Sequence, residues 1–278
     1  MRYFLIALLC LLISTRDGEC KGQVRSHEEI KIASKAVDMA MSRNGNYTYV
    51  LSEDGVLHVY KKGWVEVASM NIGAAVTKIK ASDRDDELFT IDKGGKLKIL
   101  KISFPRDIDT SNSPIKGSPK APIEIIVFSD FECPYCSNVA KILDKVLVRF
   151  PDKVKIIFKH CPLGYHKNAV EAAQAAIAAG IQGKFWEYHD LLFEHQKELS
   201  PQRLQELAEA LGLNMEKFNK DRSSPEVTAI ISRDVSQARA LEIRGVPAVY
   251  INGVFQENTQ EEALIKELEA KLGSPQKN

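Results

Sequence analysis

The chain has 278 residues, with 38 lysines and arginines against 37 aspartates and glutamates, and 44% of its residues are hydrophobic. This composition is typical of a folded globular protein and excludes disordered, collagen-like and multispan membrane classes. A formal net charge of +1 argues against a nucleic-acid partner, because neutralising phosphates requires a marked excess of basic residues. The length allows one large or two modest domains. The five cysteines are too few to staple a chain of this size, so we expect their chemistry to be local.

The N-terminus has the pattern of an export signal. Arg2 follows Met1, and an apolar stretch then runs from Tyr3 to Ile13, shorter than the ~20 apolar residues that span a bilayer. We therefore expect residues 1–20 to be a signal peptide, with a cleavage site that the pattern leaves open. The mature protein is then expected in the periplasm or another extracytoplasmic, oxidising compartment.

Residues 21–105 are expected to form a small, mostly β N-terminal domain. An amphipathic helix is predicted from Ser26 to Arg43, because a capping-box spacing precedes apolar residues at helical period. Period-two segments with turn signals then predict two β-hairpins, over 47–60 and 88–100, as an internal repeat. Two such units cannot close a propeller ring, so we expect one small sheet. The helix could cover its apolar face, which we favour, or two chains could pair their sheets in a homodimer.

The rest of the chain reads as a linker and an α/β domain. Residues 106–122 are rich in proline and serine without apolar periodicity, which predicts an extended linker. Within 123–274, a buried strand, a helix after Cys133 and a second strand predict a βαβ unit with a parallel pair. Helical patterns over about 163–243 predict an insertion, after which two short strands and a closing helix end the domain.

Cys133-Pro134-Tyr135-Cys136 stands where the buried strand turns into the helix. Pro134 fits the first helical position, where its missing N–H costs nothing. Cys133 is thereby placed at the helix N-terminus, where free N–H groups and the helix dipole lower a thiol pKa. Cys136, one turn deeper, can reach the first sulfur and close a small ring. This pattern predicts dithiol-disulfide exchange, with an exposed attacking Cys133 and a protected resolving Cys136.

Other interpretations of the cysteines are less favoured. Zinc would need two more ligands, for which Cys161 with His160 or His166 is the only candidate set, so we expect no metal and no cofactor. A purely structural bridge would not need a helix start. Cys161 fits a small buried apolar residue, although a third redox thiol or an interchain bridge is also open.

Three separated motifs together resemble the DsbA-like branch of the thioredoxin superfamily. They are Phe128-Ser129-Asp130-Phe131-Glu132 leading into the cysteine pair, Gly183 to Phe193, and Gly245-Val246-Pro247-Ala248. The resemblance covers about 123–273 and leaves the first 105 residues unexplained. It implies a thioredoxin fold with a helical insertion, an extracytoplasmic location, and oxidation or isomerisation of substrate disulfides. It also implies that Pro247 is a cis-proline facing the cysteine pair, and that Val246 offers backbone groups to an extended substrate segment.

The sequence departs from the family pattern at Val127. Many family members carry a buried acid six residues before the first cysteine, and here that position is apolar. Proton handling for Cys136 would then fall to Asp130, Glu132 or water. If these two carboxylates were close to Cys133 and desolvated, their charges would raise the pKa of its thiol and disfavour the thiolate. We interpret both as solvated loop charges.

The sequence therefore predicts a secreted protein-disulfide oxidoreductase with a thioredoxin-like C-terminal domain. Its partners would be protein thiols and disulfides and a redox partner that could be membrane-bound. An oxidase is favoured, because valine before the cis-proline resembles the oxidase members more than the isomerases. The alternatives are a disulfide isomerase or reductase and, less favoured, a chaperone or adaptor with a vestigial cysteine pair.

Overall fold

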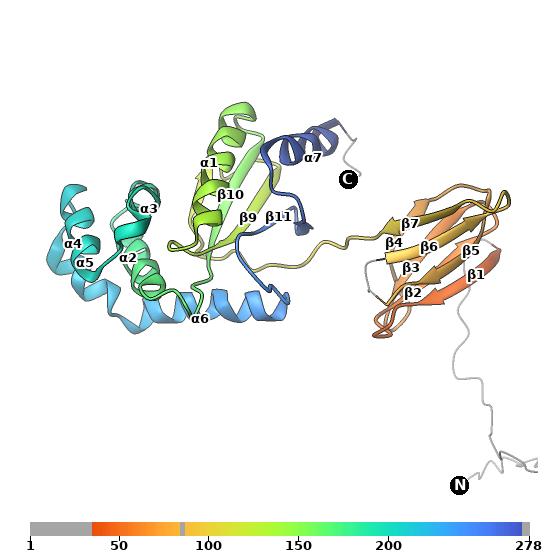
Figure 1. Cartoon of the computed structure of the whole chain (residues 1–278), viewed down its shortest axis with the longest axis horizontal. Helices are drawn as coiled ribbons and strands as arrows, with labels where there is room; N and C mark the ends of the chain where they lie inside the picture. The colour runs from red at the N-terminus through yellow and green to blue at the C-terminus, as the bar shows by residue number, and fades with distance from the viewer. Residues whose placement is uncertain (1–34, 84–86, 274–278) are drawn as a thin grey trace, which may run out of the picture. The chain divides into compact units, whose positions relative to one another are not determined.

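The computed structural model describes residues 35–83 and 87–273. These residues belong to two compact units, Met1–Ile102 and Ser103–Asn278, which we describe one at a time (Figure 1). The predicted signal peptide and the first part of the predicted N-terminal helix lie outside the described residues. Among the described residues, no helix is long and apolar enough to cross a membrane.

The N-terminal unit consists of two antiparallel sheets. The first has the order β1-β2-β3-β4, with strands Ala36–Met41, Tyr47–Ser52, Val56–Lys61 and Val65–Asn71. The second has the order β5-β6-β7, with strands Val76–Ala81, Glu87–Asp92 and Leu97–Lys101. Both predicted hairpins are confirmed as the pairs β2–β3 and β6–β7. The turn and period-two signals were sufficient to identify them.

The predicted helix is wrong over its described part, because Ala36–Met41 is strand β1. Val37, Met39 and Met41 alternate along this segment, so its apolar residues also fit a period of two. The neighbouring chain selects the strand. β1 pairs with β2, and Asp38 Oδ2 accepts a hydrogen bond of 2.8 Å from the Ile79 backbone N–H of β5.

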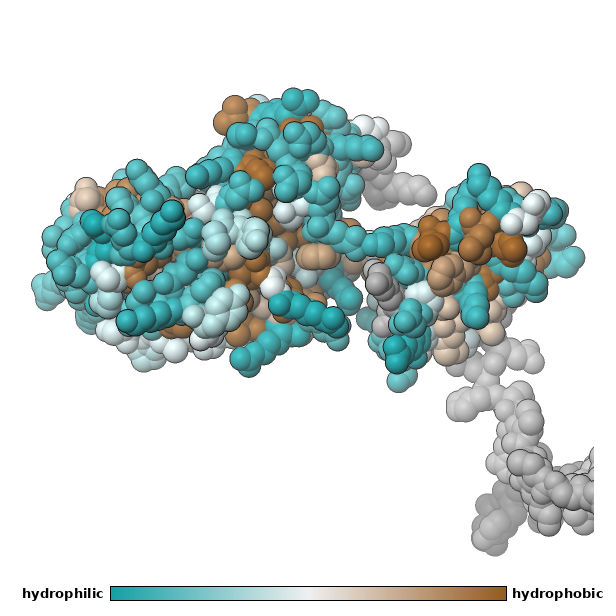
Figure 2. Space-filling view, in the orientation of Figure 1, coloured by the Kyte–Doolittle hydropathy of each residue, from teal (hydrophilic) through white to brown (hydrophobic). Residues whose placement is uncertain are grey.

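The prediction of one small sheet is also wrong. Strand β5 lies beside β1 and β2, so the first sheet has a second sheet against it. Thr48–Ser52 of β2 and Leu57–Tyr60 of β3 are buried on both faces of their sheet. The outer face of the second sheet stays open, since Ile91, Leu97 and Ile99 are 37%, 63% and 59% exposed. They share one face in the β6–β7 register, and apolar side chains gather on this unit in Figure 2.

The C-terminal unit is built on a five-stranded mixed sheet. Its order is β12-β11-β9-β10-β8, with strands β8 (Ile115–Gly117), β9 (Ile123–Ser129), β10 (Val154–His160), β11 (Ala248–Ile251) and β12 (Val254–Gln256). β9 and β10 are parallel and joined by helix α1 (Pro134–Arg149), as predicted for the βαβ unit. Helix α7 (Glu261–Gly273) packs beside α1. A second apolar cluster on the other sheet face includes Ile126, Phe128 and Ala238.

A helical insertion separates β10 from β11. It contains α2 (Ala169–Ile181), α3 (Phe185–Glu194), α4 (Pro201–Ala210), α5 (Met215–Arg222) and α6 (Pro225–Ala240), with a short 3₁₀ turn at Gln196–Glu198. Ser200 and Ser224 cap α4 and α6 by accepting from the backbone N–H of Arg203 and Val227. Helix α5 was not predicted, because Phe218 is its single buried residue and its sequence has no apolar face to detect.

The predicted linker at 106–122 is not free of the domain. Ile115–Gly117 forms edge strand β8 against β10, and Phe158 N–H donates to Pro114 O at 3.0 Å. Lys159 Nζ donates to Asp109 O at 2.8 Å. A three-residue strand is too short to show a period, so composition alone suggested an extended segment.

A buried ion pair joins β10 to α6. Lys159 Nζ lies 2.6 Å from Asp234 Oδ1, and the two side chains are 0% and 1% exposed. Asp234 Oδ2 also accepts from the His160 backbone N–H at 3.0 Å, and Arg233 approaches Oδ1 at 3.2 Å. The insertion is thus tied to the central sheet by charge as well as by apolar packing.

Candidate active site

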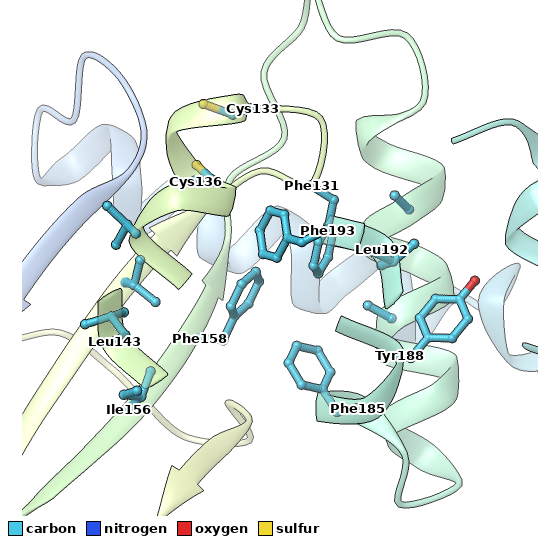
Figure 3. Packing of buried hydrophobic residues seen from close by; sticks show 14 of the residues in the cluster. Phe131, Cys133, Cys136, Leu143, Ile156, Phe158, Phe185, Tyr188, Leu192 and Phe193 are labelled. Atoms are coloured by element: carbon cyan, nitrogen blue, oxygen red, sulfur yellow. The ribbon is translucent and has the colours of Figure 1, made fainter. Parts of the chain in front are cut away.

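The two motif cysteines lie at the first turn of α1, at the carboxyl end of β9 (Figure 3). Cys133 is the N-cap residue in extended conformation and Pro134 opens the helix, as predicted. The backbone N–H groups of Cys136 and Ser137 donate to Cys133 O at 3.0 and 3.3 Å. This turn brings both thiols to the same end of the helix, and both are unbridged.

The two thiols have opposite electrostatic environments. A hydrogen bond from the Cys136 thiol lowers the pKa of Cys133 to about 6, and the backbone N–H groups of Cys136 and Tyr135 act in the same direction. Burial and the charge of Asp130 oppose this shift without reversing it. The same thiol pair raises the pKa of Cys136 above its ordinary value, and burial adds to the rise. Cys133 is therefore the thiolate near neutral pH and Cys136 keeps its proton.

The expected exposure of Cys133 is wrong, since Cys133 is 4% exposed and Cys136 is 1% exposed. The chain segment before β11 covers the first sulfur, and Cys133 Sγ lies 3.5 Å from Val246 O, a carbonyl to which the protonated form of the thiol can donate. Tyr135 between the two cysteines is 75% exposed. The Cys133 sulfur therefore lies beside the Val246 carbonyl, next to the exposed Tyr135.

The Val246–Pro247 peptide bond is cis, in agreement with what the resemblance implied. Val246 O contacts the Cys133 thiol, so the segment that leads into β11 faces the start of α1. Residues more than a hundred positions apart in the sequence thus meet at the end of the sheet where β9 ends and β11 begins. All six predicted site residues belong to the start of α1 or to this segment.

Asp130 is buried at 2% exposure, so its interpretation as a solvated loop charge is wrong. Its carboxylate accepts from the backbone N–H groups of Glu132 at 2.7 Å and Leu163 at 2.6 Å, and lies 2.9 Å from His166 Nδ1. These bonds compensate for its burial. Asp130 thereby ties the loop after β10 to the start of α1.

Two further side chains hold the active-site turn, and neither was a predicted site residue. Glu132 accepts from the Asn168 backbone N–H at 2.6 Å and from Asn168 Nδ2 at 3.1 Å. Gln196 Nε2 donates to the backbone carbonyls of Phe131 and Cys133 at 2.7 and 2.9 Å. A glutamine in a polar segment carries no sequence signal for such a role, because the fold alone brings it near.

Cys161 is buried against the second sheet face, packed in the cluster with Ile108 and Ala248, where a small apolar residue fits. Burial raises the pKa of its thiol to about 11. Its backbone N–H donates to Ser129 O at 2.9 Å. These surroundings are those of an unreactive structural cysteine.

The chain resembles known proteins along its C-terminal part. A family model described as Thioredoxin matches residues 109–270, more than half of the chain. Among curated proteins, the Na(+)/H(+) antiporter NhaA 1 of Mycolicibacterium gilvum is 36% identical over 176 residues, which are 62% of this chain and 28% of that protein. NhaA 3 of Salinispora tropica is 36% identical over 156 residues, or 56% of this chain and 24% of that protein. The chain thus spans about a quarter of the length of these relatives.

Solved structures agree on the fold. BdbD from Bacillus subtilis in its oxidised form has a TM-score of 0.56 at 22% identity, covering 62% of this chain and 99% of that one. A thioredoxin-like oxidoreductase from Silicibacter pomeroyi has a TM-score of 0.52 at 24% identity, covering 60% and 98%. The thiol-disulfide exchange protein alpha-DsbA2 from Wolbachia pipientis has 0.53 at 20%, covering 58% and 88%. The chain therefore belongs to the thioredoxin family, and its C-terminal unit has a DsbA-like thioredoxin fold.

Proposed function

We propose that this protein is an extracytoplasmic thiol-disulfide oxidoreductase that exchanges disulfides with protein substrates. The observation that carries the proposal is the pair of neighbouring thiols at the start of α1, one with a lowered and the other with a raised pKa. Exchange requires a thiolate that attacks and a second thiol within reach that resolves the mixed disulfide. Cys133 and Cys136 are suited to these two roles.

In the proposed reaction a substrate sulfur and Cys133 share a mixed disulfide. Attack by Cys136 forms the Cys133–Cys136 bond and releases the substrate sulfur as a thiolate, and the oxidase reaction is the reverse sequence. The Val246 carbonyl lies 3.5 Å from the sulfur of Cys133, and the cis bond to Pro247 follows it. An extended substrate segment would lie along these two residues, with Pro134 and Tyr135 beside it.

Transfer of electrons from substrate thiols to the cysteine pair, which is the oxidase direction, is favoured. A stabilised Cys133 thiolate favours the reduced pair, which makes the oxidised pair a stronger oxidant of substrate thiols. An oxidase would need a redox partner to restore its disulfide, and that partner could be membrane-bound. A reductase or isomerase would use the same pair from its reduced state, and a measured reduction potential separates these roles.

The first test is a comparison of Cys133→Ala with the unaltered protein in insulin reduction and in peptide oxidation. Both activities are expected to fall to background, because the attacking sulfur is gone. Cys161→Ala is the matched control and should retain activity, since its thiol is buried on the other sheet face. Retained turnover in Cys133→Ala would exclude catalysis by Cys133 and favour the hypothesis of a chaperone or adaptor.

The protein is proposed to form a homodimer, and variants in the N-terminal unit can test this. Leu97 and Ile99 are exposed on one sheet face, where a second copy could cover them. If two copies meet there, Leu97→Glu with Ile99→Glu should convert a dimer to a monomer in sedimentation velocity. Val148→Glu, at an exposed apolar residue of α1, should leave the dimer intact. A monomeric unaltered protein would remove the dimer and weaken the isomerase alternative.

A further inference from the structure

A small cavity lies behind the resolving cysteine, on the side of Cys136 that faces the sheet. Its volume is about 10 Å3, at the lower limit of what can hold one water molecule. Leu143, Ile156 and Phe158 give it apolar walls and are drawn below Cys136 in Figure 3. Val127, at the position where the resemblance suggested a buried acid, is also in the wall. The cavity therefore receives no carboxylate from β9.

The polar part of the cavity wall comes from other elements. It consists of Ser129 at the end of β9, Lys116 of β8, Asp144 of α1 and His189 of α3. The Ser129 side chain hydrogen-bonds to the Cys136 thiol. The cavity thus connects the buried sulfur to a group of ionisable side chains.

These ionisable side chains form one connected cluster. Lys116 Nζ lies 2.6 Å from Asp144 Oδ1 and 3.6 Å from Asp190 Oδ2. His189 Nδ1 lies 2.8 Å from Asp190 Oδ1. The side chains of Asp144 and Asp190 are 47% and 53% exposed, whereas that of His189 is 6% exposed. The cluster leads from the buried cavity to solvent.

His189 has the chemistry of a proton acceptor in this cluster. Burial lowers its pKa below the ordinary value, although Asp190 acts in the opposite direction, so its imidazole is neutral at neutral pH. Because the Asp190 carboxylate accepts from Nδ1, the imidazole proton stays on Nδ1, and Nε2 is the nitrogen that can accept another proton. The charged and titratable groups that face it are Asp190 of α3, Lys116 of β8, Asp144 of α1 and His160 of β10.

We propose that His189 accepts the proton of the Cys136 thiol when Cys136 resolves the mixed disulfide. The Ser129 hydroxyl or one water molecule in the cavity carries the proton between them. Asp190 is a positioning residue that holds the imidazole in its accepting form. This inference rests on the proposed thiol-disulfide exchange. It gives His189 the proton transfer that the apolar Val127, at the position of the family's buried acid, cannot perform.

In this step the Sγ–H bond of Cys136 breaks, a bond forms between the two cysteine sulfurs, and the bond from Cys133 to the substrate sulfur breaks. The substrate sulfur leaves with that electron pair and is reduced, while the cysteine pair is oxidised. The proton passes to His189 and then, through the exposed Asp190, to solvent. In the oxidase direction, His189 returns a proton to the departing Cys136 sulfur.

The test separates the two chemical steps in one experiment. Reduced protein is mixed in stopped flow with excess 5,5′-dithiobis(2-nitrobenzoate), and release of the coloured thiolate is followed. The first phase reports attack by Cys133 on the probe, and the second reports resolution by Cys136. His189→Gln should slow the second phase roughly 100-fold and leave the first unchanged. His195→Gln, a half-buried histidine just after α3, is the matched control and should change neither phase.

The pH profile distinguishes proton transfer from a packing defect. In the unaltered protein, the second-phase rate should fall as pH is lowered through the titration of His189. In His189→Gln this inflection should vanish, and the rate should rise steadily with hydroxide concentration. An unchanged second phase with the same pH profile would overturn the proposal. Loss of the first phase in the unaltered protein would instead contradict the proposed function.

A second variant covers the case in which His189→Gln does not fold. Asp190→Asn alters an exposed carboxylate, so the fold should persist, as circular dichroism can verify. It removes the group that fixes the imidazole tautomer, and the second phase should slow about tenfold with its inflection moved to lower pH. A second phase of unaltered rate in Asp190→Asn would exclude its positioning role and, with no folded His189→Gln, overturn the proposal.

Discussion

Replacing Lys159 by methionine is expected to reduce the free energy of unfolding by about 3–5 kcal/mol, because it leaves Asp234 charged and buried without its ammonium partner. Two hydrogen bonds from Lys159 Nζ to Asp109 and Ser113 are lost in the same change. Chemical denaturation with a circular dichroism signal measures the difference. A loss below about 1 kcal/mol would show that Arg233 and backbone groups are sufficient to compensate for the Asp234 charge.

Two controls locate the origin of this loss. Lys159→Met combined with Asp234→Leu should be more stable than Lys159→Met alone, since no uncompensated charge stays buried. Arg149→Met breaks an ion pair with Glu269 in which both side chains are more than half exposed, and should cost about 0–1 kcal/mol. If the double variant is as unstable as the single one, the lost hydrogen bonds rather than the charge are responsible.

Brief alkylation of the reduced protein with iodoacetamide is expected to label Cys133 alone, with a rate that rises to a plateau around a midpoint near pH 6. The thiolate is the reactive form, and at pH 7 a thiol of pKa 6 is mostly ionised whereas an ordinary one is roughly 3% ionised. Cys136 and Cys161 should stay unlabelled, because the hydrogen bond with Cys133 and burial raise the pKa of Cys136, and burial and two nearby carboxylates raise the pKa of Cys161. Peptide mass mapping at a series of pH values measures both features.

The pH dependence has a definite direction. Below about pH 6 the Cys133 thiolate is protonated and alkylation should slow about tenfold per pH unit, whereas above it the rate should level off. Cys136→Ala removes the thiol that hydrogen-bonds to Cys133, so the midpoint should move to higher pH. Preferential labelling of Cys136, or a midpoint unmoved in that variant, would contradict the assigned roles.

Local signals in the sequence predicted much of the C-terminal unit. Ser200-Pro201 and Ser224-Pro225 mark helix starts because capping chemistry is confined to a few adjacent residues. The βαβ unit and the placement of Cys133 at the start of α1 follow from a buried apolar run and the helical period after it, which are also local signals. Such features need no knowledge of distant contacts, and the structure confirms them.

The errors share a physical cause, which is that distant partners decide between locally equivalent choices. Ala36–Met41 fits both helical and strand periods, and pairing with β2 selects the strand. Asp130 is a loop residue whose burial depends on Leu163 and His166, donors from a loop that only the fold brings near. The polar groups around the cavity behind Cys136 come from four separate elements, so no spacing in the sequence could have assembled them.

The near-complete burial of Cys133 has a consequence for the substrates that the proposed function would allow. Only 4% of the Cys133 residue is exposed, so a cysteine held rigidly on the flat surface of a compact protein would have little access to its sulfur. A partner must instead bring its cysteine on a thin, pliable stretch of chain that fits past Tyr135 and Val246. Under the proposed function, the site would therefore select substrates by their folding state. It would act on chains that are still unfolded in preference to those that have finished folding.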